Sequence, residues 1–457
     1  MNFPTAAKTE DLAQIARATF DAALRAVDAR QAVQKAVRVA GERLFIDDLE
    51  FDWREISGIY AIALGKAAAE MASALSNVVG DKLRGGVISC PKNAGTFSDS
   101  DFPRVWEIFH GGHPLPNQES LAAARAAFAL LERANNKNSL VIILVSDGGS
   151  AMMELPCNEE ISLANLQTTN QVLVNCGAKI GEINALRRRI SRVKGGGLRR
   201  AAENAKQVTL IISDTNDGEA YNVASGPTME PENDLSEAEI AEIMRRYELT
   251  KALPRTVVDC LEKPFPKIRN PILKTQHWQV LSSNSSATTA AANQLREFNF
   301  AVEMADDLIE TPIDEGCAEL VKRLGDLRTQ TSPEQSVAIV SGGEFACPVR
   351  GSGTGGRNLE SALRTAILFN ELKKEAKWQN ANFVALYAGT DGIDGNSPAT
   401  GAVCTETTIE RAKTKNLDAD KFLETSDSYN FFAALDDQIE IGATGTNVRD
   451  IRILLAY

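Results

Sequence analysis

The sequence has no apolar run long enough to cross a membrane. Its longest apolar runs, such as residues 141–145, are far shorter than the roughly 20 residues that a spanning helix needs. The first twelve residues are polar and lack the apolar core of a signal peptide. These absences predict a cytoplasmic protein without a membrane partner.

Closely spaced cysteines and an excess of basic residues are also missing. The seven cysteines are scattered, odd in number and without a CxxC pair, which argues against a structural zinc and a disulfide framework. The net charge is −12, whereas a non-specific nucleic-acid binder needs a basic face. Anionic substrates stay open, because a local pocket on an acidic protein can be positive.

At 457 residues the chain exceeds one ordinary hydrophobic core, which predicts two domains. Short apolar runs alternate with helical patterns in both halves, which predicts an α/β fold. A polar, proline-bearing stretch follows residue 262, so we place the domains at 1–270 and 271–457. Apolar spacing over 9–27 and 30–44 predicts two packing helices at the start of the first domain.

The first candidate site follows an apolar strand predicted over 59–64. Gly65 and Lys66 come directly after it and open a helix over 67–75. The start of a helix favours phosphate through its N–H groups and its dipole, and a lysine adds a full positive charge. The pattern is not a Walker A loop, because Ala67 stands where Ser or Thr would be. A solvated lysine in the first helical turn is the alternative interpretation.

A phosphate-binding turn is predicted after the apolar strand 139–145. Gly148, Gly149 and Ser150 lie in the SDGGSAM sequence that follows and suit a turn whose N–H groups cradle phosphate. Lys194, followed by three glycines, suits a phosphate held by a lysine and by backbone N–H groups. Three arginines nearby make this the most basic patch of the chain, and an exposed basic helix end is the alternative.

Two other loops carry polar candidates. His110 and His113 lie in a Gly/Pro loop without a third histidine or a cysteine, so hydrogen bonds that fix the loop are a better interpretation than a metal site. Asn117 is predicted to cap the next helix. Asp214 and Asp217 follow another predicted strand, at the end where ligands collect in open α/β sheets.

The loop 388–401, which reads AGTDGIDGNSPATG, holds the acidic candidates. It follows a buried strand predicted over 383–387. Asp391 and Asp394 could carry charge to a metal ion or to a substrate hydroxyl, while the glycines let the backbone approach a ligand. Taken alone, the loop is better explained as a solvated turn. Asn284, which precedes another predicted helix, is added as a cofactor-binding residue.

Residues 351–356 match the GxGxxG pattern of dinucleotide-binding proteins and precede a helix predicted over 359–372. A lone match is weak, and the acidic residue expected about 20 positions later would fall in a charged helix end. We therefore do not predict a dinucleotide site. Arg357, beside the glycines, is better explained as a forked donor for an anion.

Taken in order, these motifs resemble the class II glycerate 2-kinase family, whose C-terminal half is the MOFRL module. The motifs are ALGKAA, HPLPN, GGS, INALRRRIS, VKGGG, ASGPT, SGGE, GTGGRN, AGTDGIDG and TGTNVRD. The resemblance covers nearly the whole chain and implies ATP-dependent phosphorylation of D-glycerate at its 2-hydroxyl with Mg²⁺. It also implies a Rossmann-like N-terminal domain that faces a smaller α/β, MOFRL-type domain across the active-site cleft.

The resemblance also assigns individual residues. The functional lysine of the family falls on Lys66, its functional arginine on Arg357 and its acidic TDG motif on Asp391. Two departures stand out. Asp147 replaces a glycine of the SGGGS pattern, and ISDTNDG replaces ISDVxGD, so Asp217 has no secure match. Both departures lie where nucleotide and metal are expected, and they leave the preferred hydroxy acid open.

Together these patterns predict a kinase that transfers the γ-phosphoryl group of ATP to a small hydroxy acid. Such a transfer depends on positioning and positive charge more than on covalent help. Lys66 and Arg357 are expected to reach the phosphoryl group and the substrate carboxylate. Asp391 is expected to orient or deprotonate the hydroxyl, or to hold Mg²⁺ with Asp394. The residues expected to bind the cofactor are Gly148, Gly149, Ser150, Lys194 and Asn284.

Two rival functions stay open. An NAD(P)H-dependent hydroxypyruvate reductase is favoured by the glycine pattern at 351–356 and by a common description of the family. Against it stand the missing ribose-binding acid and the lack of a histidine placed as proton donor. A non-catalytic sensor of sugar acids or nucleotides is supported only by Asp147. The expected partners are small molecules, and a homo-oligomer is left open.

Overall fold

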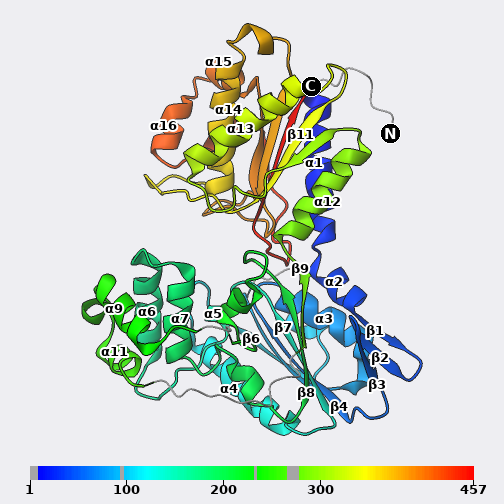
Figure 1. The fold of residues 1–457 in the computed structure, drawn as a ribbon, viewed down its shortest axis with the longest axis vertical. Coiled ribbons are helices and arrows are strands. Elements are labelled where there is room, and N and C mark those ends of the chain that lie inside the picture. The colour runs from blue at the N-terminus through cyan, green and yellow to red at the C-terminus, as the bar shows by residue number, and fades with distance from the viewer. Residues whose placement is uncertain (1–8, 93–96, 231–233, 265–276) are drawn as a thin grey trace. The chain divides into compact units, whose positions relative to one another are not determined.

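The computed structural model describes residues 9–92, 97–230, 234–264 and 277–457. The chain forms two compact α/β units, which are coloured by residue number in Figure 1. The parallel-sheet unit comprises Ala29–Leu281, and the mixed-sheet unit comprises Met1–Asp28 together with Ser282–Tyr457. The predicted α/β class with two sheet-containing parts is thereby confirmed.

The parallel-sheet unit has the strand order of a Rossmann fold. Its six-stranded sheet runs β6-β5-β4-β7-β8-β9, and the pairs from β6 to β8 are parallel. The order therefore reverses between β4 and β7, and open α/β sheets bind ligands outside the carboxyl ends at such a point. The strands are β4 (Gly58–Leu64), β5 (Leu83–Cys90), β6 (Trp106–His110), β7 (Ser139–Val145), β8 (Lys206–Ile212) and β9 (His277–Ser282).

Helices cover this sheet because its strands are apolar on both faces. All seven residues of β7 are buried, as expected of a strand inside a parallel sheet. Alanines and leucines of α4 pack on the face that carries Ile62, Val87 and Val141. The helices and short helical turns around this sheet are α3 (Ala68–Val79), α4 (Gln118–Ala134), α5 (Gly149–Met152), α8 (Gly197–Arg200), η1 (Gly80–Lys82), η2 (Asp99–Asp101) and η3 (Ala220–Ser225).

A group of helices, here called the helical cluster, packs at one side of the same unit (Figure 1). It has its own apolar core, in which Leu166, Leu186 and Val257 are among the buried residues. The cluster consists of α6 (Leu163–Asn175), α7 (Ile180–Ile190), α9 (Glu237–Arg246), α10 (Leu249–Ala252) and α11 (Arg255–Leu261).

The helix predicted over 30–44 is wrong in its second half. Helix α2 (Ala29–Ala36) ends early, and an antiparallel three-stranded meander follows. Gly41 adopts a φ of +58° in its first turn, which suits glycine, and the next residues alternate between buried and exposed. The helical spacing had run across this turn. The strands are β1 (Val37–Ala40), β2 (Arg43–Ile46) and β3 (Leu49–Asp52).

The mixed-sheet unit is built on a second six-stranded sheet with the order β10-β11-β15-β12-β13-β14. Only β10 and β11 are parallel, and the other neighbours run antiparallel. As a result, the carboxyl ends of β11 and β12 and the amino end of β15 share one edge. The strands are β10 (Ala301–Met304), β11 (Val337–Gly343), β12 (Phe383–Gly389), β13 (Gly401–Thr405), β14 (Gln438–Ile439) and β15 (Asp450–Ala456).

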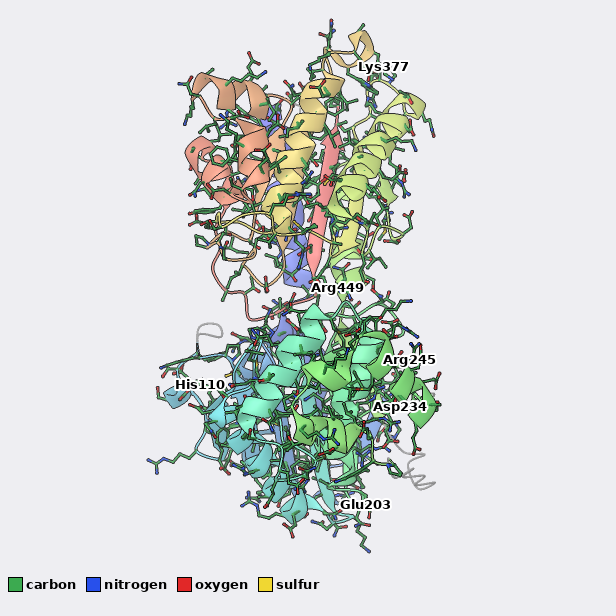
Figure 2. The ribbon with its side chains drawn as sticks, turned by 90° about the vertical axis from the view of Figure 1, so that its left-hand side faces the viewer. His110, Glu203, Asp234, Arg245, Lys377 and Arg449 are labelled. Carbon is green, nitrogen blue, oxygen red and sulfur yellow. The ribbon has the colours of Figure 1, made fainter. Side chains whose placement is uncertain are left out.

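Helices cover both faces of this sheet (Figure 1). One face packs on the helices that follow the strands, around a core that includes Leu363, Phe369 and Phe431. Charged side chains such as Lys377 lie at the surface (Figure 2). The helices are α12 (Asn284–Glu297), α13 (Ile313–Gln330), α14 (Arg357–Leu372), α15 (Thr408–Thr414), α16 (Ala419–Glu424), α17 (Ser428–Leu435) and η5 (Ala376–Trp378).

The first helix of the chain belongs to the mixed-sheet unit. Helix α1 (Thr9–Ala26) lies beside α12 on the second face of that sheet, and its Thr9 Oγ1 donates to Glu406 Oε1 at 2.6 Å. The expected first domain, 1–270, therefore differs from the compact unit, and the expected boundary itself lies outside the described residues. Amphipathic spacing tells that a helix packs, but not which sheet it covers. None of the described helices combines the length and hydropathy of a membrane span.

Candidate active site

The first candidate site lies at the carboxyl edge of the parallel sheet, where its strand order reverses. The backbone after β4 is held against the backbone after β7: the Lys66 N–H donates to Asp147 O at 2.7 Å and the Ala67 N–H to Ser146 Oγ at 3.0 Å. Gly65 has a φ of +113°, and a Cβ there would lie 2.3 Å from Ser146 Oγ. A glycine is therefore required at this close approach.

Lys66 forms an ion pair with Asp147 across the same point. The distance between Lys66 Nζ and Asp147 Oδ2 is 3.0 Å, and the two side chains are 26% and 18% exposed. Both side chains are therefore partly accessible to solvent. The residue that departs from the family pattern is thus in direct contact with the lysine expected to meet phosphate.

The predicted turn at 148–150 forms at this edge. Gly148 has a φ of +79° and precedes α5, and a Cβ there would contact Met152 and the His113 ring. Ser150 Oγ lies 2.9 Å from Ser225 Oγ, which ties the turn to η3. The glycine-serine sequence thus places backbone groups near Lys66, and its expected contact with phosphate stays a prediction.

Lys194 is placed differently from its expected role. Only 2% of the residue is exposed, and Lys194 Nζ contacts the Glu154 carboxylate and donates to Ser150 O at 2.8 Å. Burial lowers the pKa of Lys194, against the opposing effect of Glu154. The Lys194 side chain therefore supports the 148–150 turn through its hydrogen bond to the Ser150 carbonyl. Glu154 was missed, although it lies nine residues after the end of β7 as a single acid within an apolar run.

The arginines beside Lys194 are used inside the helical cluster. Arg187 Nε donates to Asn170 Oδ1 at 2.9 Å, and Arg188 Nη2 to Asp234 Oδ1 at 2.5 Å. Asp234, labelled in Figure 2, lies at the surface of this unit. Both arginines are therefore engaged by partners from neighbouring segments, and Arg188 is paired with a carboxylate.

His110 takes part in hydrogen bonds that fix its loop, as predicted. Its side chain, labelled in Figure 2, lies 3.3 Å from Asp99 Oδ2 through Nε2, and its carbonyl accepts a hydrogen bond from Asn117 Nδ2 at 2.9 Å. Asn117 also caps α4 by accepting from the Ser120 N–H at 2.8 Å. The prediction of an N-cap at Asn117 is confirmed.

The second candidate site lies at the shared edge of the mixed sheet and is built around Arg357. Gly356 precedes this arginine, which begins α14. Arg357 Nε donates to Asp450 Oδ2 at 2.6 Å, and Nη2 donates to Glu344 Oε1 at 2.6 Å. Burial disfavours the charged guanidinium, but the carboxylates of Asp450 and Glu344 outweigh it and raise the pKa of Arg357. The side chain stays charged and is 35% exposed.

Asp450 is the centre of this polar group. It is 2% exposed and also accepts a hydrogen bond from Asn358 Nδ2 at 2.9 Å. Asn284 Nδ2 donates to the carbonyl oxygens of Val448 and Asp450 at 2.7 and 3.0 Å. Asn284 therefore fixes the start of β15, and with it the carboxylate that holds Arg357.

Asp394 caps α14 instead of facing solvent. Its Oδ1 accepts from the Asn358 N–H at 3.1 Å, and its Oδ2 accepts from the Leu359 N–H at 2.8 Å. The residue is 3% exposed, and burial, opposed by these two hydrogen bonds, raises the pKa of Asp394 to about 7. Both oxygens of the predicted metal ligand are thus engaged by the helix start.

Asp391 lies beyond the end of β12, at the same edge as Arg357. It is half-buried, and its Oδ1 accepts from the Ile393 N–H at 3.3 Å. Its carbonyl accepts from the Thr444 N–H at 3.3 Å. Across the described residues, no group of three or more His, Cys, Asp or Glu is arranged to hold a metal ion. A magnesium role for Asp391 and Asp394 stays a prediction.

The GxGxxG sequence does not form a dinucleotide-binding turn. It lies in the long connection between β11 and α14 and does not follow a strand directly. A Cβ at Gly351 would lie 2.5 Å from Thr425 O, and one at Gly353 would lie 2.5 Å from the Asp427 Cβ. These glycines let the connection pack closely on the segment before α17, which accounts for the pattern without a cofactor.

At the second site, sequence reasoning singled out Arg357 but missed three polar residues of the network that holds it. Glu344, Asn358 and Asp450 are the last residues of the SGGE, GTGGRN and TGTNVRD motifs, and none had been singled out. A signal was present for two of them, because Glu344 directly follows β11 and Asp450 begins β15 at the shared edge. Their pairing needs a mixed sheet, whose strand order no local pattern gives.

Family comparisons agree with this architecture. A domain of unknown function (DUF4147) matches residues 15–262, and the MOFRL family matches residues 337–450. A glycerate 2-kinase of Pyrococcus horikoshii is 32% identical over 452 residues, which cover 97% of each chain. This chain belongs to the glycerate 2-kinase family.

Other members and a solved structure extend the match. The glycerate kinase of Rattus norvegicus is 31% identical and covers 98% of this chain and 93% of its own length. The crystal structure of a glycerate kinase from Thermotoga maritima has a TM-score of 0.80 at 27% identity, covering 98% of this chain and 100% of the other. The family recognised from the motifs is confirmed.

Proposed function

We propose that this chain transfers the γ-phosphoryl group of ATP to the 2-hydroxyl of D-glycerate, which gives ADP and 2-phosphoglycerate. The observation that carries the proposal is the 32% identity, over 97% of both chains, to a glycerate 2-kinase. The proposed partners are small molecules only, and the proposed location is the cytoplasm.

Lys66 is the proposed cation for the transferred phosphoryl group. It lies at the reversal point of a Rossmann sheet, next to the start of α3, where dipole and N–H groups already favour anions. Its charge would offset the negative charge on the equatorial oxygens during transfer. The 148–150 turn is proposed to hold neighbouring phosphates, and Lys194 acts behind it as a positioning residue.

Arg357 is the proposed donor for the glycerate carboxylate. Its Nε and Nη2 are held by Asp450 and Glu344, whereas Nη1 has no hydrogen-bond partner among the described residues. A guanidinium fixed in this way offers the N–H groups of one nitrogen in a set direction, which suits a carboxylate. Asn284 contributes by fixing the backbone at Asp450, so its role is positioning.

Asp391 is the proposed group for the 2-hydroxyl. A carboxylate beside the hydroxyl could orient it and accept its proton as the phosphoryl group arrives. Mg²⁺ is proposed to enter with the nucleotide, because this ion keeps several waters and needs only one or two carboxylates beside the phosphates. Asp391 could supply one such oxygen, whereas Asp394, engaged at the start of α14, does not fit. When bound, Mg²⁺ would neutralise charge on the phosphates.

The test measures ADP formed by the purified protein from Mg-ATP with and without D-glycerate. Glycerate-dependent ADP supports the proposal. ADP formed at the same rate without glycerate would reduce the function to ATP hydrolysis. A parallel reaction with hydroxypyruvate and NADPH, followed by nicotinamide absorbance, tests the reductase, and turnover there without ATP would overturn the kinase assignment.

A further inference from the structure

Two cysteines far apart in the sequence meet beside the helical cluster. Cys157 Sγ and Cys260 Sγ are 2.8 Å apart, although the two residues are separated by 103 positions in the sequence. Cys157 lies in the segment after α5, and Cys260 lies in the last turn of α11. Both residues are half-buried, so the pair lies at the edge of the apolar core and not inside it.

Both cysteines are anchored to the same end of α7. The Cys157 N–H donates to Ile190 O at 2.8 Å, and Cys260 Sγ contacts Arg189 O at 3.8 Å. The two thiols are therefore held against one another by a common support. Little movement of either side chain is needed to join them.

We propose that Cys157 and Cys260 are a site of reversible oxidative modification, at which a hydroperoxide converts the two thiols into a disulfide that braces the helical cluster. This inference does not depend on the proposed kinase activity. A scattered set of seven cysteines gave no hint of it, because the partners lie in different segments.

The chemistry of the two sulfurs is unequal. The hydrogen bond from Cys157, with a further contribution from Lys263, lowers the pKa of Cys260 to about 7, although burial opposes this. The same hydrogen bond, together with burial, raises the pKa of Cys157. Cys260 is therefore the thiolate that attacks first, because thiolates and not thiols are nucleophilic.

The proposed steps balance with hydrogen peroxide as the oxidant. The Cys260 thiolate attacks one peroxide oxygen, forms a sulfenic acid and releases hydroxide, which leaves as water after taking a proton. The Cys157 sulfur then attacks Cys260 Sγ, the S–O bond breaks, and the oxygen leaves as a second water. Two thiols are oxidised by two electrons in total, and one peroxide is reduced. A small dithiol reverses the bond by exchange.

The test exposes the full chain to a low excess of hydrogen peroxide and maps its disulfides by mass spectrometry of unreduced peptides. The expected result is a Cys157–Cys260 linked peptide, a loss of two free thiols, and full reversal by dithiothreitol. In Cys157→Ala protein the peptide is lost, and a sulfenic-acid probe labels Cys260 instead. In Cys176→Ala protein, a control for another half-buried cysteine of the same unit, the linked peptide is unchanged.

The bracing is tested on the oxidised wild-type protein itself, so it needs no variant. The bond should raise the melting temperature of the parallel-sheet unit by roughly 5–10 °C, because it closes a long loop in the unfolded chain. The proposal would be overturned if Cys176 became oxidised while no Cys157–Cys260 linked peptide formed. Linked peptides between different molecules would overturn it as well. An unchanged melting temperature in the crosslinked protein would overturn the bracing role.

Discussion

Lys66 and Arg357 each follow a glycine at the edge of a sheet and lie near the start of a helix, but their surroundings differ. Lys66 forms an ion pair with Asp147, and both side chains are partly open to solvent. Arg357 is held by two carboxylates, one of which, Asp450, is 2% exposed. Lys66 is therefore positioned mainly by the backbone around it, whereas Arg357 is positioned by a buried polar network.

This difference teaches how each charge is positioned. At Lys66 the two loops are joined by main-chain hydrogen bonds, so the side chain can be changed without leaving a buried group unsatisfied. At Arg357 the side chain itself neutralises Asp450, so its removal leaves a carboxylate in a poorly solvated place. A substitution of Lys66 should therefore lower activity with little loss of stability, whereas a substitution of Arg357 should lower both.

The largest effect is expected for Lys66→Ala. Loss of the charge at the reversal point should lower kcat by between about 10²- and 10³-fold, or roughly 3–4 kcal/mol of transition-state stabilisation. The free energy of unfolding should change by no more than about 1 kcal/mol, because the Lys66–Asp147 pair is partly open to solvent and such pairs contribute little. Turnover assays and urea unfolding measure the two quantities.

The matched control is Lys206→Ala, at the amino end of β8, where the lysine lies 3.7 Å from Glu55. Its turnover should equal that of the wild type. Near-normal kcat in the Lys66 variant would remove this residue from the mechanism.

Lys194→Ala tests whether the parallel-sheet unit also contains a buried polar support. Removing the lysine leaves the Glu154 carboxylate, 2% exposed, without its partner, so stability should fall by about 3 kcal/mol. A double variant, Lys194→Met with Glu154→Leu, should regain most of that stability and keep much of its turnover. A folded but inactive double variant would instead place Lys194 in contact with the nucleotide.

Arg357→Ala should reduce both the stability of the protein and its turnover of glycerate. We expect a loss of about 2 kcal/mol in stability, less than for a fully buried pair because Arg357 is partly exposed, and a fall of roughly 10²-fold in kcat/KM for glycerate. Arg357→Lys should recover stability better than turnover, because a lysine keeps the charge but not the fork. Unchanged stability in the alanine variant would show that the two cations are held alike.

The smallest effect is expected for Asp147→Asn. The Asp147 carboxylate competes with phosphate oxygens for Lys66 Nζ at 3.0 Å, so its neutralisation should lower KM for ATP by about 3- to 10-fold, or roughly 1 kcal/mol. Steady-state kinetics at several ATP concentrations measure this change. A large loss of kcat would mean that the carboxylate takes part in the reaction and is no mere competitor.

Local features could be predicted from the sequence because their causes are local. The strand before Gly65, the turn after β7 and the helix cap at Asn117 all depend on neighbouring residues and agree with the structure. The helix expected over 30–44 failed, because its periodicity crossed a glycine turn and a tightly alternating meander.

The remaining features depend on contacts between distant segments. Lys194 is buried against Glu154 and Asp394 caps a helix, and the sequence predicted neither contact. Asp450 holds Arg357 across 93 positions of sequence. Residue type alone cannot tell a charge that faces a ligand from one that faces another side chain.

The most direct test of the account is the identity of the product formed from Mg-ATP and D-glycerate, determined by phosphorus NMR of the reaction mixture. The account predicts 2-phosphoglycerate in amounts equal to the ADP released. A signal from 3-phosphoglycerate, or ADP with inorganic phosphate and no phosphoglycerate, would contradict it.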